Sequence, residues 1–152
     1  MNRIIGLDVG DKRIGMAISD ELLFTAQPLE LYERRGPRQD IAYMKSKLEA
    51  LLVTDLVVGL PVMMKGEPST MAHRVTDFAD QIKACCAVRV IFWDERLSTV
   101  QANRSMLEGD LSRKKRKSKM DVVAAQLILQ GYLDSLRIKR ERAEEDKRWG
   151  RA

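Results

Sequence analysis

Two strands of a sheet are predicted by residues 3–18, which read RIIGLDVGDKRIGMAI. Two apolar runs flank a short polar segment, in which Gly10 permits a tight turn between antiparallel strands. The first run contains a single carboxylate, Asp8, near its end. A third extended stretch with alternating leucines follows at residues 27–33, so the three strands together predict an antiparallel meander.

Helices and strands alternate in the rest of the chain. Apolar residues at helical spacing predict helices over residues 37–52 and 69–84, and short apolar runs predict strands over 54–60 and 88–93. A capping pattern predicts a short helix over 98–108, and an apolar stretch predicts a long helix over 120–136. The expected fold is α/β, a mixed five-stranded sheet whose first three strands form the antiparallel meander, with helices on both faces.

The composition is that of one globular domain, because 45% of the 152 residues are apolar and 32% are charged. The apolar runs are too short to cross a membrane, which takes roughly 20 residues. The only two cysteines, Cys85 and Cys86, are adjacent and cannot form a disulfide framework. We therefore expect a cytoplasmic protein with one domain over residues 1–137. The charged tail at 138–152 is expected to be a frayed helix or disordered.

Basic residues are concentrated in the last quarter of the chain. Residues 1–112 contain 14 Lys and Arg against 16 Asp and Glu, whereas residues 113–152 contain 13 against 6. Six basic residues crowd one segment that we expect to be a loop: Arg113, Lys114, Lys115, Arg116, Lys117 and Lys119. Such a block indicates a polyanion partner, although a solvated loop explains it equally simply.

Three acidic positions lie at the ends of predicted elements: Asp8, the pair Asp94 and Glu95, and Asp121. In α/β sheets, ligands bind beyond the carboxyl ends of the central strands, where the first two positions lie. Converging carboxylates repel one another unless a divalent cation joins them, and ligands that are all oxygen favour Mg²⁺ or Mn²⁺. Two such ions support phosphodiester hydrolysis.

Each acid also has a simpler structural interpretation. Asp8 can begin a turn, and Glu95 can pair with a neighbouring arginine on the surface. Asp121 follows Ser118 at the spacing of a capping box, in which the acid stabilises the start of a helix. Spacing alone leaves both interpretations open.

Four segments resemble the signature blocks of the YqgF family, the bacterial proteins related to Holliday junction resolvases and regarded as pre-16S ribosomal RNA nucleases. They are GLDVGDKRIGMAISD at 6–20, VVGLPVMMKG at 57–66, DERLSTVQA at 94–102 and KMDVVAAQLILQGYL at 119–133. The resemblance implies a ribonuclease-H-like fold and an active site that binds metal through Asp8, Asp121 and one acid of the DER motif. Only one acid of that pair can face the site, because neighbours along a strand point to opposite faces, and alternation alone does not say which. We favour Glu95, with Asp94 as the alternative.

The resulting hypothesis is a metal-dependent nuclease that helps to trim the 5′ end of the 16S ribosomal RNA precursor. Lys12, Arg13, Arg96 and the basic segment at 113–119 would position phosphates. One alternative is a resolvase of branched DNA, and another is a non-catalytic factor that binds RNA or protein on a nuclease-like scaffold. We expect RNA rather than branched DNA as the partner, and a mainly monomeric protein with weak dimers at most at high concentration.

Overall fold

The sheet has five strands in the order β3-β2-β1-β4-β5 in the computed structural model, which describes residues 2–61, 70–97 and 113–150. The strands are β1 (Arg3–Val9), β2 (Arg13–Ser19), β3 (Ala26–Glu33), β4 (Val53–Leu60) and β5 (Arg89–Asp94). The first three form an antiparallel meander, and β4 pairs in parallel with β1 and β5. The predicted mixed sheet is confirmed.

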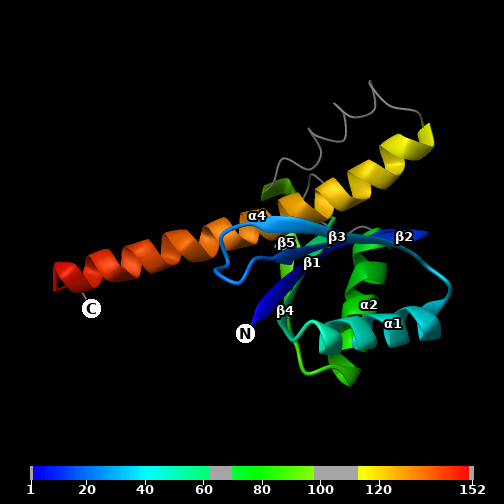
Figure 1. Ribbon diagram of the computed structural model, residues 1–152, viewed down its shortest axis with the longest axis horizontal. Helices are drawn as coiled ribbons and strands as arrows, with labels where there is room; N and C mark the ends of the chain where they lie inside the picture. The colour runs from blue at the N-terminus through cyan, green and yellow to red at the C-terminus, as the bar shows by residue number, and fades with distance from the viewer. Residues whose placement is uncertain (1, 62–69, 98–112, 151–152) are drawn as a thin grey trace.

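Helices cover both faces of this sheet, as predicted (Figure 1). Helices α1 (Pro37–Ala50) and α2 (Thr70–Cys85) pack on one face, and α4 (Arg113–Arg148) crosses the other. A single 3-10 turn, η1 (Glu95–Leu97), follows β5. The short helix predicted over 98–108 lies outside the described residues.

Strand alternation divides the side chains of β1 between two cores. Ile5 and Leu7 are fully buried against α1 and α2, while Ile4 belongs to the core under α4. Gly6 also faces α4, because a Cβ atom there would lie 2.7 Å from the Cβ of Leu129. Asp8 continues this alternation and therefore faces the α4 side.

Helix α4 lies unusually close to the sheet because small residues leave it room. A Cβ atom on Gly15 of β2 would lie 2.0 Å from the carbonyl oxygen of Asp121, and one on Gly59 of β4 would lie 2.4 Å from the Cδ1 of Ile128. Real Cβ atoms do not approach neighbours so closely. At Gly15 the obstacle is backbone, so β2 needs glycine there, whereas at Gly59 the tip of the Ile128 side chain would have to shift.

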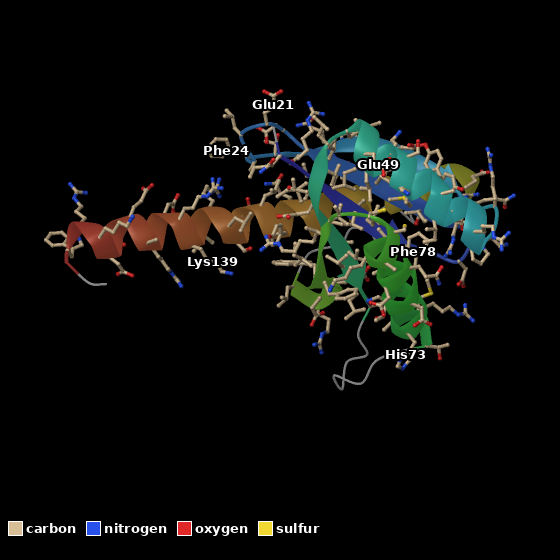
Figure 2. The ribbon with its side chains drawn as sticks, turned by 90° about the horizontal axis from the view of Figure 1, so that it is seen from below. Glu21, Phe24, Glu49, His73, Phe78 and Lys139 are labelled. Carbon is tan, nitrogen blue, oxygen red and sulfur yellow. The ribbon has the colours of Figure 1, made fainter. Side chains whose placement is uncertain are left out.

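The segment at 113–119 was expected to be a loop, and this prediction is wrong, because α4 begins at Arg113. Lysine and arginine are good helix formers, and no glycine or proline interrupts residues 113–120. The helix also continues beyond the sheet to Arg148, and every residue from Arg137 to Gly150 is exposed. Lys139 is labelled on this projecting part in Figure 2. The domain boundary at residue 137 stays a prediction.

Across the part of the chain that the structure describes, every helix is too short or too polar to traverse a bilayer.

Candidate active site

Carboxylates from three distant parts of the sequence line one cavity. It has a volume of about 280 Å³, and its walls include Asp8, Glu95 and Asp121. Asp8 lies near the end of β1, Glu95 follows β5, and Pro61, also in the wall, follows β4. The cavity therefore lies at the carboxyl ends of three neighbouring parallel strands, where α/β sheets bind their ligands.

Asp8 and Asp121 are brought together through Gly15. In the antiparallel register of β1 and β2, Asp8 is paired with Gly15. Because Gly15 has no side chain, the backbone of α4 approaches β2 at Asp121. Asp8 itself is nearly buried, with 8% of the residue exposed.

Glu95 and Asp94 diverge where β5 ends. Glu95 is 6% exposed, and its Oε1 lies 3.1 Å from the position that a Cβ atom on Gly59 would take, on the α4 side of the sheet. Asp94 instead pairs in register with Leu60, which packs against the opposite core. Glu95 therefore lines the cavity and Asp94 does not.

The carboxylate of Asp94 forms an ion pair with the neighbouring Arg96. The Nη2 of Arg96 lies 2.6 Å from Oδ2 of Asp94, and its backbone amide donates to Oδ1 at 2.9 Å. These hydrogen bonds hold the pKa of Asp94 below its ordinary value. Arg96, predicted to hold a phosphate, thus has its guanidinium committed to Asp94 in this structure.

The other predicted phosphate-binding residues flank the carboxylates along the chain. Lys12 is exposed in the turn after β1, and Arg13 is half-buried at the start of β2. The basic segment 113–119 forms the first two turns of α4, directly before Asp121. At a rise of about 1.5 Å per residue, its backbone lies within about 12 Å of that acid along the helix axis.

The donor set suits a hard divalent cation, because Asp8, Glu95 and Asp121 offer only oxygen. Within residues 2–61, 70–97 and 113–150, no three acidic, histidine or cysteine side chains are close enough together to hold a metal ion as they stand. Asp8, Glu95 and Asp121 nevertheless line one cavity, so the oxygen donors that a hard divalent cation prefers are all in its wall.

Two ion pairs beside the cavity were not predicted. Arg74 of α2 contacts Asp11 with 2.7 Å between Nη1 and Oδ1, and Asp11 lines the cavity. Arg34 contacts Asp40 at 2.9 Å and also donates to the carbonyl oxygen of Gly10 at 3.0 Å. No local spacing signals the contacts at Asp11 and Gly10, since their partners lie 63 and 24 residues away.

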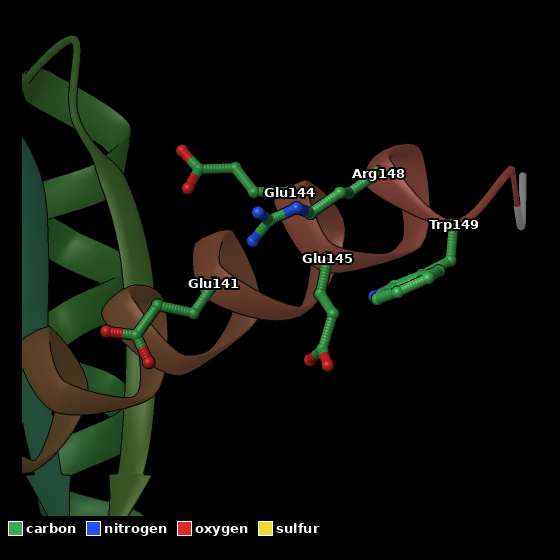
Figure 3. A pocket seen from close by; sticks show the side chains of 5 residues that line it. All are labelled: Glu141, Glu144, Glu145, Arg148 and Trp149. Carbon is green, nitrogen blue, oxygen red and sulfur yellow. The ribbon is translucent and has the colours of Figure 1, made fainter.

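A larger hollow, of about 510 Å³, lies far from these carboxylates on the projecting end of α4. Figure 3 shows its lining side chains, from Glu141 to Trp149, all carried by the end of this one helix. No second element of the described chain converges there to position a ligand, so this hollow is a feature of splayed surface side chains.

The sheet order, the helices on both faces and the acidic cavity define the chain as a protein of the ribonuclease-H-like class. Two solved structures share this fold. Thermus thermophilus RuvC in complex with a Holliday junction substrate matches with a TM-score of 0.58 at 15% identity, covering 89% of this chain and 96% of that one. The Fowlpox virus resolvase bound to junction DNA matches with a TM-score of 0.54 at 12% identity, covering 88% and 98%.

Sequence comparison gives the family. Residues 2–135 match the RuvX family, described as Holliday junction resolvase, and the chain belongs to this family. A relative from Clostridioides difficile strain 630 is 48% identical over 132 residues, which cover 87% of this chain and 94% of the relative. One from Clostridium acetobutylicum is 49% identical over 134 residues, covering 88% and 99%. Both are named "putative pre-16S rRNA nuclease", the name expected from the YqgF resemblance.

Proposed function

We propose that the chain is a metal-dependent nuclease that hydrolyses phosphodiester bonds and helps to trim the 5′ end of the 16S ribosomal RNA precursor in the cytoplasm. The observation that carries this proposal is the convergence of Asp8, Glu95 and Asp121 on one cavity at the carboxyl ends of three strands. Family membership supports the same chemistry.

The three carboxylates are the proposed ligands of Mg²⁺ or Mn²⁺. A bound cation supplies Lewis-acid polarisation of the phosphate and a stronger nucleophile from water. Asp8 and Glu95 are nearly buried in the cavity wall. Asp121 is positioned by the close packing of the α4 backbone against Gly15. Asp8, Glu95 and Asp121 would hold the cation through carboxylate oxygens from three separate elements.

Phosphate positioning is assigned to the basic residues that flank the carboxylates in the chain. Lys12 and Arg13 follow Asp8 in the turn and the next strand, and the segment 113–119 precedes Asp121 on α4. Arg96 joins this set only when a phosphate displaces Asp94 from its guanidinium.

The test is cleavage of a precursor RNA that carries the 5′ extension of 16S ribosomal RNA, with Mg²⁺, with Mn²⁺ and with a chelator. Asp8→Asn and Glu95→Gln should each lower the rate more than about 100-fold, since metal catalysis is worth several kcal/mol and each 1.4 kcal/mol is about tenfold. Asp94→Asn is the matched control, because Asp94 lies outside the cavity. Full activity in Asp8→Asn would overturn the site.

A second candidate function is resolution of branched DNA, which the description of the RuvX family favours. Resolving a four-way junction takes two matched cuts, and a two-fold dimer supplies two active sites for them. Trimming one RNA end needs one active site, so we expect a monomer by light scattering at micromolar concentration. A stable dimer that cuts junctions symmetrically and leaves the RNA intact would favour this candidate.

The non-catalytic alternative makes a different prediction for the same variants. A pure binding factor has no need of buried carboxylates beside a basic segment, and its affinity for RNA should not depend on Mg²⁺. If the wild-type protein binds the precursor tightly but does not cut it with either cation, the binding role replaces the enzyme.

A further inference from the structure

Arg34, the first residue after β3, holds both ends of the turn that follows the Asp8 strand. Its Nη1 donates to the carbonyl oxygen of Gly10 at 3.0 Å, and its backbone amide donates to the carbonyl oxygen of Lys12 at 2.8 Å. The turn is closed internally by the amide of Gly10, which donates to the carbonyl oxygen of Arg13 at 2.8 Å. Gly10 itself lines the carboxylate cavity.

Arg34 is in turn held by a fully buried acid on α1. Its Nε donates to Oδ2 of Asp40 at 2.9 Å. The other carboxylate oxygen of Asp40 accepts from the hydroxyl of Tyr32 at 2.8 Å and from the amide of Arg35 at 2.9 Å. Burial raises the pKa of Asp40, but these hydrogen bonds outweigh it and leave the pKa below its ordinary value. The acid is therefore a charged, fixed anchor.

Helix α2 contributes the third contact. The guanidinium carbon of Arg34 lies 5.0 Å from the ring centroid of Phe78, which is labelled on α2 in Figure 2. A cation over an aromatic face is attracted by the ring's negative charge density. Arg34 thus connects α1, α2 and the turn after β1 through one side chain.

Only arginine can make these contacts at once. The guanidinium is a rigid, planar fork, so Nε binds Asp40 while Nη1 reaches Gly10 and the flat face lies over Phe78. A lysine ammonium is a single point of charge. It can keep the ion pair with Asp40 but cannot also span the distance to the carbonyl of Gly10.

We propose that Arg34 is a positioning residue of the carboxylate site. It fixes the turn at Gly10–Lys12 against α1 and α2, and through this turn the positions of the flanking Asp8 and Asp11. This inference rests on the proposed function, because the residues that it positions are the proposed metal ligands and their neighbours. Arg34 acts through the turn and does not itself line the cavity. A group held in place in this way contributes to the rate by preorganisation.

The test uses Arg34→Lys and measures amide hydrogen exchange of residues 10–13 in the full-length protein without metal. Removing one charge-assisted hydrogen bond should raise exchange at this turn about tenfold. The matched control is Lys47→Met, which removes another ion pair between α1 and β3, with 2.6 Å between the Nζ of Lys47 and the Oε1 of Glu30. The control should leave exchange at residues 10–13 unchanged.

Cleavage kinetics give the second readout. Arg34→Lys should lower kcat about tenfold with the KM for RNA unchanged, whereas Lys47→Met should keep both values. Tyr32→Phe removes one contact of Asp40 only and should raise exchange at the turn by a smaller factor, which keeps the test usable if Arg34→Lys does not fold. Unchanged exchange at residues 10–13 in the folded variants overturns the inference. A wild-type protein that cuts no RNA overturns the proposed function instead, while the exchange result still decides whether Arg34 fixes the turn.

Discussion

The carbonyl oxygen of Asp121 lies 2.0 Å from the position that a Cβ atom on Gly15 would occupy. Gly15 is also the register partner of Asp8 across β1 and β2. A strand position without a side chain therefore brings two of the proposed metal ligands together, one from the sheet and one from the helix. The geometry of the site depends on a residue that carries no chemistry of its own.

Gly15→Ala should displace α4, so the folded variant should cleave RNA much more slowly than the folded wild-type protein even though its free energy of unfolding falls only moderately. The added methyl group meets backbone rather than a flexible side chain, so we expect a loss of about 1–3 kcal/mol in the free energy of unfolding. The measurement combines urea unfolding with the cleavage rate of the folded protein. Gly131→Ala is the control, because its Cβ would meet the Trp93 ring at 2.9 Å, at a different part of α4. Equal activity losses in both variants would contradict a specific role for Gly15.

Neutralising part of the basic segment should weaken the salt dependence of RNA binding. We expect the triple variant Lys114→Gln, Lys115→Gln, Lys117→Gln to make the plot of log K against log salt shallower by about 0.7 for each phosphate that the protein no longer neutralises. Fluorescence anisotropy between low and moderate salt measures this slope. As a control, the triple variant Lys139→Gln, Arg140→Gln, Arg142→Gln removes the same charge from the projecting end of α4. An identical slope in wild type and the first variant would mean that the segment contacts no phosphate and is simply a solvated surface.

Deleting residues 140–152 should leave the fold intact. Residues from Arg140 to Gly150 are exposed, so their removal uncovers no core and should change stability by no more than about 0.5 kcal/mol. For a domain of this size, that corresponds to a change of about 1–2 °C in Tm by calorimetry. Truncation before Tyr132 is the contrast, since it removes the buried Tyr132 and Leu133 and should prevent folding. A large fall in Tm for the first deletion would mean that the tail packs on the domain.

Acid should destabilise the wild-type protein partly through Asp40. Burial raises the pKa of Asp40, but the hydrogen bonds from Arg35, Arg34 and Tyr32 lower it by more, so the folded-state pKa lies below the unfolded value near 3.8. This stabilisation is therefore fully present above about pH 4 and is lost as the pH falls through the folded-state pKa. Asp40→Asn should be about 2 kcal/mol less stable at about pH 6. It should also lose less stability than wild type between about pH 6 and pH 3, measured by urea unfolding. Equal losses would assign the acid sensitivity to other carboxylates.

The sheet could be predicted because its signals are local. Two apolar runs at 3–9 and 13–18, with a glycine between them, are enough to indicate a hairpin. The parallel strands β1 and β4 are short apolar runs buried on both faces, and β5 is a third apolar run at the edge of the sheet. The position of Asp8 near a strand end, and hence near the ligand-binding edge, follows from the same reasoning.

The packing of α4 could not be predicted, because it depends on contacts between residues about a hundred positions apart. Nothing in the local sequence indicates that Gly15 and Asp121 meet, or that the basic segment 113–119 would join the helix that carries the acid. In the sequence, Asp40 is an ordinary acid in the first turn of a helix, and only the folded chain pairs it with Arg34. Contacts of both kinds, between residues six or about a hundred positions apart, are set by tertiary packing rather than by local spacing.

Because α4 is one uninterrupted helix from the cavity to its projecting end, a change in its tilt on the sheet displaces that end. Residues 121 and 148 lie on the same rod, about 40 Å apart along its axis. A tilt of about 5° about the helix's seat on the sheet would move the outer end by about 3.5 Å, given that length. A spin label or fluorophore attached near Trp149 would therefore magnify changes in the tilt of α4 and make them measurable far from the substrate.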